Sequence, residues 1–119
     1  MLKDAECFTH IYLRTGRTDM RLGIDGLLTV IGGQMGLDPT EPGSVFLFCG
    51  RKKNRMKALI FEGDGWLLYY KRLTGDCSYQ WPRGENEARK LTKQQFRWLM
   101  EGLSIEQKKV IKDTKPDIY

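Results

Sequence analysis

The chain has 119 residues, of which 40% are apolar and 29% charged, with 20 Lys+Arg against 15 Asp+Glu. This length supports one small domain with a hydrophobic core and leaves little room for a second. A mean hydropathy of −0.49 comes with no apolar run near the roughly 20 residues that cross a bilayer, and Asp4 and Glu6 oppose a signal peptide. We expect one cytoplasmic domain over 1–119, without a membrane partner, with its core in about 8–104 and a C-terminal helix and tail in 105–119.

The positive charge is concentrated in one short segment. Residues 51–57 read RKKNRMK, five bases without an acid, and the 15 remaining bases match the 15 acids of the whole chain. Such a patch attracts polyanions. The alternative is a solvated hairpin edge, where lysine and arginine also block strand pairing.

Cysteine and histidine usage argues against a disulfide framework and against a zinc site. Cys7, Cys49 and Cys77 are odd in number and widely spaced, and His10 is the single imidazole. Cys49 lies in an apolar run and is expected to be a small buried hydrophobe. We expect no metal, no cofactor and no small-molecule substrate.

The N-terminal third predicts a strand and a helix. Phe8 to Leu13 has strand character and closes in a turn at 15–17. A helix should follow, with Thr18 or Asp19 as its cap. Its apolar residues keep the spacing of one buried face at Ile24, Leu27, Leu28, Ile31 and Met35. Residues 37–43 form a proline-rich loop.

The central part predicts a meander of strands over 44–49, 57–62 and 66–73. A tight turn at 62–65 joins the second strand to the third. The basic segment then lies at one tip of the sheet and the acidic turn at the other. Ser78 to Trp81 is expected to add a fourth strand before Pro82.

The C-terminal part predicts two helices. Thr92 with Gln95 forms a capping box, and the helix it opens stops at Gly102. Ser104 with Gln107 repeats the capping pattern, which predicts a peripheral helix over about 105–113. The fold class is therefore α+β: a small, mainly antiparallel sheet, a meander, packed with one N-terminal helix and two C-terminal helices.

No nucleophile elbow, Walker loop or zinc-protease helix is present. Asp19 and Asp25 are the carboxylates that a small metal-dependent nuclease would use, but such sites need several convergent carboxylates. We therefore predict no catalytic residues.

The basic segment is the stronger functional signal. Its cations are suited to DNA phosphates, and on the neighbouring strand Lys71 and Arg72 extend the surface where they face outward. The segment contributes Arg51, Lys52, Lys53, Arg55 and Lys57. Tyr69 or Tyr70 is a possible platform for a base, with core packing expected for at least one of the two.

Several blocks resemble a known family. Residues 15–27 read TGRTDMRLGIDGL, similar to the T-G-x-T-D-M-R-x-G-x-D-G-L signature of the TnpB-type accessory proteins of insertion-sequence-sixty-six (Orf-two-like) transposable elements. Residues 45–57, VFLFCGRKKNRMK, resemble the family's F-x-F-x-G-R-[RK]-x-[DN]-x-x-K block. KRL at 71–73, WP at 81–82, LT at 91–92 and LMEGL at 99–103 follow in the family's order.

The resemblance implies a non-catalytic accessory protein that acts in transposition beside a separate transposase. From the residues, the leading hypothesis is DNA binding through the basic segment, with Arg21 as a further candidate ligand. An i to i+4 pair of Arg21 with Asp25 is the structural alternative. The alternative function is an adaptor that docks on the element's transposase.

Overall fold

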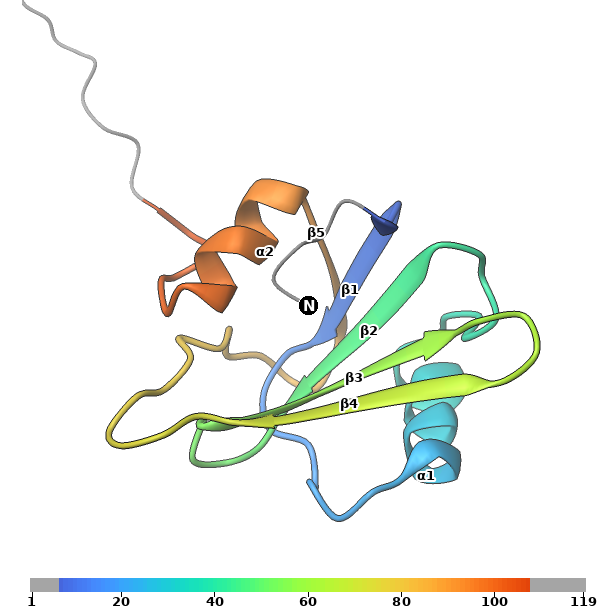
Figure 1. The fold of residues 1–119 in the computed structure, drawn as a ribbon, viewed down its shortest axis with the longest axis horizontal. Helices are drawn as coiled ribbons and strands as arrows, with labels where there is room; N and C mark the ends of the chain where they lie inside the picture. The colour runs from blue at the N-terminus through green and yellow to red at the C-terminus, as the bar shows by residue number, and fades with distance from the viewer. Residues whose placement is uncertain (1–6, 108–119) are drawn as a thin grey trace, which may run out of the picture.

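The computed structural model describes residues 7–107 as one five-stranded sheet in the order β4-β3-β2-β1-β5, with helices on both faces (Figure 1). The strands are β1 (His10–Arg14), β2 (Ser44–Cys49), β3 (Arg55–Phe61), β4 (Trp66–Arg72) and β5 (Ala88–Leu91). The helices are α1 (Ile24–Thr29), which continues into the π-helical turn η2 (Val30–Gln34), and α2 (Lys93–Met100).

The α+β class is confirmed, and the meander is confirmed for β2, β3 and β4, which pair antiparallel in chain order. The remaining topology differs from the prediction. β1 pairs parallel with β2, with His10 opposite Ser44 and Leu13 opposite Leu47, and β5 pairs antiparallel with β1. The connection from β1 to β2 through α1 and η2 is thus a crossover, which parallel strands require.

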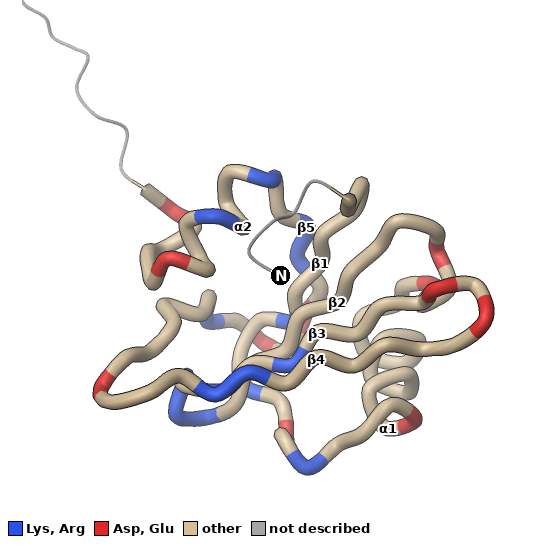
Figure 2. The backbone as a smooth tube through the Cα atoms, viewed as in Figure 1, with Lys and Arg blue, Asp and Glu red and all other residues tan. Residues whose placement is uncertain are grey.

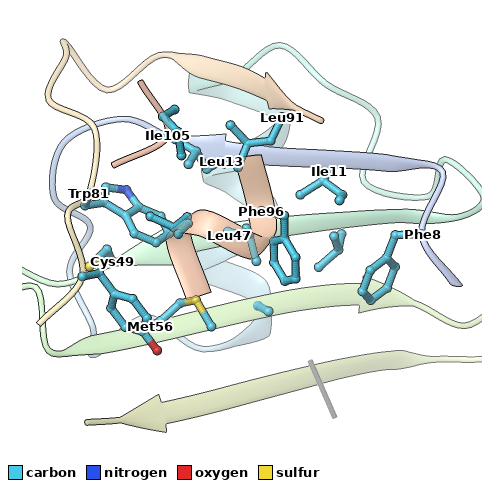
Figure 3. Close-up of a cluster of buried hydrophobic side chains, with 14 residues drawn as sticks. Phe8, Ile11, Leu13, Leu47, Cys49, Met56, Trp81, Leu91, Phe96 and Ile105 are labelled. Atoms are coloured by element: carbon cyan, nitrogen blue, oxygen red, sulfur yellow. The ribbon is translucent and has the colours of Figure 1, made fainter. Parts of the chain in front are cut away.

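Two hydrophobic clusters cover the two faces of the sheet, and β2 contributes to both because every residue of it is buried. Val45, Leu47 and Cys49 point toward the cluster that Phe96 and Leu99 of α2 complete (Figure 3). Phe46 and Phe48 point toward the cluster built on α1 and η2. A strand buried on both faces reads as a continuous apolar run, as SVFLFC does.

The predicted strand over Ser78–Trp81 is wrong. Tyr79 and Trp81 are buried at 2% and 4% exposure, but they reach the core from an irregular segment. The Trp81 Nε1–H donates to the Arg14 carbonyl at 2.9 Å, so this segment packs over the end of β1. The strand at that edge is β5, whose four residues include Arg89 and Lys90 and lack a clear apolar alternation.

The helix caps are partly as predicted. The capping box is confirmed: the Thr92 hydroxyl accepts from the Gln95 N–H at 3.0 Å, and the Gln95 side chain accepts from the Thr92 N–H at 2.9 Å. Gly102, with φ +83°, ends the segment as expected. Neither Thr18 nor Asp19 caps α1, because Gly23 occupies the N-cap position without a side-chain hydrogen bond.

The predicted C-terminal helix over 105–113 lies mostly outside the described residues. Where the structure describes it, Ile105 to Gln107 is not helical. Ile105 is 3% exposed and belongs to the α2-side cluster, so this part is not peripheral. Ser104 accepts from the Glu106 N–H at 3.0 Å, which makes a local turn in place of the capping box.

Two exposed glycines provide a matched test of the packing between the loop after β1 and the segment before β5. A Cβ added at Gly84 would lie 2.4 Å from Oγ1 and 2.7 Å from Cβ of Thr15, a buried residue whose hydroxyl is bonded to Glu87. A Cβ at Gly33 meets nothing within 4 Å. We predict that Gly84→Ala lowers the free energy of unfolding by about 1–3 kcal/mol, whereas Gly33→Ala leaves it unchanged or raises it by up to about 1 kcal/mol. Urea denaturation measures both, and equal effects of the two substitutions would contradict the described packing.

Candidate nucleic-acid interface

Two loops meet where the parallel strands β1 and β2 end. The loop after β1 is held against the end of β2 by the Thr18 N–H, which donates to the Cys49 carbonyl at 2.8 Å. Met20 packs so closely on Gly50 that a Cβ there would lie 2.8 Å from Met20 Cγ. Residues 15–22 and the hairpin at 50–55 therefore form one continuous surface.

This surface contains a cleft of about 610 Å³ with a strong excess of basic residues. Its basic lining residues are Arg14, Arg17, Arg51, Lys52 and Arg55. Within the described part of the chain, Asp19 is the only carboxylate among the lining residues. Figure 2 shows the blue segments of the β2–β3 hairpin and the end of β4 at one end of the sheet, with acidic loops at the opposite end. The expected separation of charge between the two tips is confirmed.

Arg14 forms the buried part of the cleft and is 8% exposed. Its Nη1 donates to the Arg17 carbonyl at 2.9 Å and to the Thr18 hydroxyl at 3.1 Å, and its Nη2 donates to the Gln34 side chain. Burial lowers the pKa of the Arg14 guanidinium, but an arginine remains charged at any physiological pH. A cation is thus held in a fixed orientation below the basic surface.

Asp19 is engaged by Arg21, so it offsets little of the charge in the cleft. Arg21 Nη2 lies 2.9 Å from Asp19 Oδ2, and the Arg21 Nε and backbone N–H donate to Oδ1. These hydrogen bonds lower the pKa of Asp19 to about 2. The pair is therefore intact at neutral pH, and its contribution to stability is lost as the pH falls from about 4, the usual carboxyl pKa, through the folded-state pKa of about 2. The structural alternative considered for Arg21, a pair with Asp25, is not what forms, because Arg21 pairs with Asp19.

The hairpin bases divide between two faces. Arg51, Lys52 and Arg55 are exposed and line the cleft. Lys53 adopts a left-handed backbone with φ +62° and lies on the other side, where it lines a hollow of about 210 Å³ with Arg83. Arg51 lines both hollows.

The remaining candidate residues lie around the cleft. Lys57 Nζ donates to the Leu22 carbonyl at 2.7 Å and lies 5.5 Å from the centre of the Tyr70 ring. On β4, Arg72 pairs with Arg55 and so shares its face, whereas Lys71 pairs with the core residue Met56 and points to the opposite face.

Tyr69 and Tyr70 are 39% and 52% exposed, so the expectation that at least one packs in the core is wrong. Both belong to β4, which is an edge strand of the sheet.

The described residues contain no group of three or more His, Cys, Asp or Glu side chains placed to hold a metal ion. Cys49 is buried as expected, and burial raises the pKa of its thiol to about 12, whereas Cys7 and Cys77 are exposed free thiols. Over the same part of the chain, no helix has the length and apolar character needed to cross a membrane.

Comparison with known families decides the relationship that the motifs indicated. Residues 9–110 match the family described as IS66 Orf2 like protein. The chain belongs to this family. The match includes both loops of the cleft and extends the predicted resemblance over most of the chain.

Two curated relatives of this IS66 Orf2-like chain come from Sinorhizobium fredii (strain NBRC 101917 / NGR234). "Uncharacterized protein y4hO" is 31% identical over 93 residues, which cover 78% of this chain and 79% of the relative. "Uncharacterized protein y4jC" is 27% identical over 108 residues, which cover 88% and 91%. No solved structure matches the chain.

The sequence interpretation of this IS66 Orf2-like chain missed Arg14 and Arg17. Each is an isolated base, and neither lies in the charged run at 51–57. Their position in the sequence could have indicated them, because both lie at the turn after the first strand and Arg17 lies within the family signature. Only the parallel pairing of β1 with β2 shows that they face the hairpin.

Proposed function

We propose that this chain is a non-catalytic accessory protein for the transposition of a bacterial insertion sequence, and that it binds DNA phosphates through its basic hairpin. Membership in the IS66 Orf2-like family supports the association with an insertion sequence. The observation that carries the DNA-binding proposal is the cleft, where five basic residues face one carboxylate that already pairs with Arg21.

The charge distribution suits a polyanion that approaches from one end. Arg51, Lys52 and Arg55 are exposed at the end of the sheet opposite the acidic turn at 62–65. Attraction at one end and repulsion at the other orient the domain as it meets DNA. Contacts to phosphates give affinity and position without selecting a base sequence.

Around the cleft, the exposed Arg21 and Arg72 extend the same surface. Lys53 and Lys71 belong to the opposite face of the hairpin. A DNA strand would contact them only if it extended from the cleft around the tip of the hairpin. Lys57 contributes its charge without lining the cleft, since its ammonium group donates to the Leu22 carbonyl.

Replacement of Arg51, Lys52 and Arg55, the three exposed hairpin bases that line the cleft, by glutamine tests this function. Because each phosphate contact releases counterions, log Kd depends on log salt concentration with a slope set by the number of contacts. We predict that the triple variant flattens this slope by about three units and weakens binding to a short DNA duplex at low salt. Fluorescence anisotropy over a salt series measures the slope.

A charge-matched control replaces Lys90, Lys93 and Arg97, which belong to β5 and α2, by glutamine. This variant loses the same three positive charges and should keep the wild-type slope to within about one unit. Equal flattening in both variants would mean that only net charge matters, and an unchanged slope in the hairpin variant would contradict the proposal.

Docking on the element's transposase is the second candidate function, and the outer edge of β4, which pairs with β3 alone among the described strands, favours it. The hairpin of β3 and β4 is closed at both ends, where the Glu62 N–H donates to Gly65 and the Leu73 N–H donates to Asn54, each at 2.8 Å. By the antiparallel alternation, the Tyr70 N–H then faces away from β3. A strand of the transposase that pairs with this edge would use that N–H and cover the exposed tyrosine.

The two substitutions Tyr70→Pro and Tyr70→Ala separate strand pairing from side-chain contact. Proline removes the outward N–H, whereas alanine keeps it. If the adaptor function holds, the wild type and Tyr70→Ala capture the transposase from a nuclease-treated extract and Tyr70→Pro does not. Capture that vanishes after nuclease treatment, or equal capture by both variants, would contradict docking at this edge.

A further inference from the structure

We propose that the base of the cleft is a discrete site for one phosphate group of a nucleic-acid strand, with Arg14 as its buried cation and Arg17 and Arg51 above it. This inference rests on the proposed function and deepens it. The hairpin supplies general attraction to DNA, and the Arg14 site recognises a single phosphate.

Among residues 7–107, the charge of Arg14 lacks a partner of opposite sign. The ion pairs of the described residues join His10 to Glu41, Arg21 to Asp19 and Arg89 to Glu106, and none includes Arg14. Its hydrogen bonds go to neutral acceptors, and its Nε is buried without any hydrogen-bond partner. A buried cation is costly unless an anion compensates it, so an anionic ligand in the cleft would lower the free energy of this arrangement.

The guanidinium is held from two separate segments. Thr18 and the Arg17 carbonyl hold it from the loop after β1, and Gln34 holds it from η2. π-helical turns are rare and occur frequently at functional sites. The neighbouring Gly32 and Gly33 have open space around the position of a Cβ, so close packing does not explain them. A rigidly held guanidinium suits recognition of an oxyanion because little side-chain freedom is lost on binding.

The place of the site in the fold and its chemistry both favour a phosphate. In sheets with parallel strands, ligands bind beyond the carboxyl ends of the strands, and Arg14 is the last residue of β1. Arginine matches the geometry of phosphate oxygens through paired N–H donors. A volume of about 610 Å³ is in the range of pockets that hold a small ligand and is ample for a nucleotide. The phosphate comes either from the end of a strand or from its backbone.

The test compares a short oligothymidylate with and without a 5′-phosphate, each bound to wild type, Arg14→Gln and Arg97→Gln. We expect Arg14→Gln to weaken binding of the preferred oligonucleotide by about tenfold or more, and Arg97→Gln, on α2, to leave it unchanged. A wild-type preference for the 5′-phosphorylated strand that disappears in Arg14→Gln supports a terminal phosphate. Equal wild-type affinities that fall together in Arg14→Gln support a backbone phosphate. Unchanged affinities in a folded Arg14→Gln overturn the site.

The exposed Arg17 keeps the inference testable if Arg14→Gln does not fold. Its backbone carbonyl accepts the Arg14 hydrogen bond, so Arg17→Gln preserves that contact. We expect the same oligonucleotide to bind Arg17→Gln about fivefold or more weakly, and unchanged affinity would overturn the site.

Binding of a DNA duplex is measured in parallel. The Arg14 site alone is refuted if both variants still bind the duplex and both bind the oligonucleotide as tightly as wild type does. The proposed function is refuted if wild type does not bind the duplex.

Discussion

The parallel hydrogen-bonded ladder between β1 and β2 determines where the basic residues lie. Because the two strands run in the same direction, the loop after Arg14 and the hairpin after Cys49 leave the sheet at the same edge. The Thr18 N–H extends the contact beyond the strands by donating to the Cys49 carbonyl at 2.8 Å. An antiparallel arrangement of the same two strands would place these loops at opposite ends of the sheet, and the cleft would not exist.

The ladder itself depends on burial from both sides. β2 is covered by the α2-side cluster on one face and by α1 and η2 on the other. The crossover that makes β1 and β2 parallel also carries Gln34 back to Arg14. The elements that form the second core therefore also position the buried cation, so the fold and the candidate site are stabilised together.

Features that depend on neighbouring residues were predictable from the sequence, and features that depend on distant ones were not. Thr92 and Gln95 predict their capping box because both hydrogen bonds form within one turn. The turn at 62–65 predicts its hairpin for the same reason. β5 escaped prediction because its four residues carry two bases and gain their strand conformation from pairing with β1. The sequence left the role of Arg21 open between a ligand contact and a pair with Asp25, because local spacing does not determine its partner, and the loop geometry pairs it with Asp19.

The candidate site follows the same rule. The hairpin bases form one run in the sequence, so the sequence alone predicts them as candidate ligands. Arg14 and Arg17 become candidates only because the parallel pairing brings them into one cleft with Arg51 and Arg55. The structure thus shows more than a charged surface. The basic residues are arranged around a cleft whose buried part is an arginine without a carboxylate partner in the described part of the chain.

An NMR titration of the ¹⁵N-labelled chain with a short DNA duplex tests the central claim most directly, because it reports on every backbone N–H at once. DNA binding at the basic end of the sheet predicts the largest shifts at residues 14–22 and 50–57, from the two loops that form the cleft. The acidic loops at 38–41 and 62–65 should remain unperturbed. Shifts confined to the edge of β4 or to α2, with residues 14–22 and 50–57 unchanged, would contradict the account.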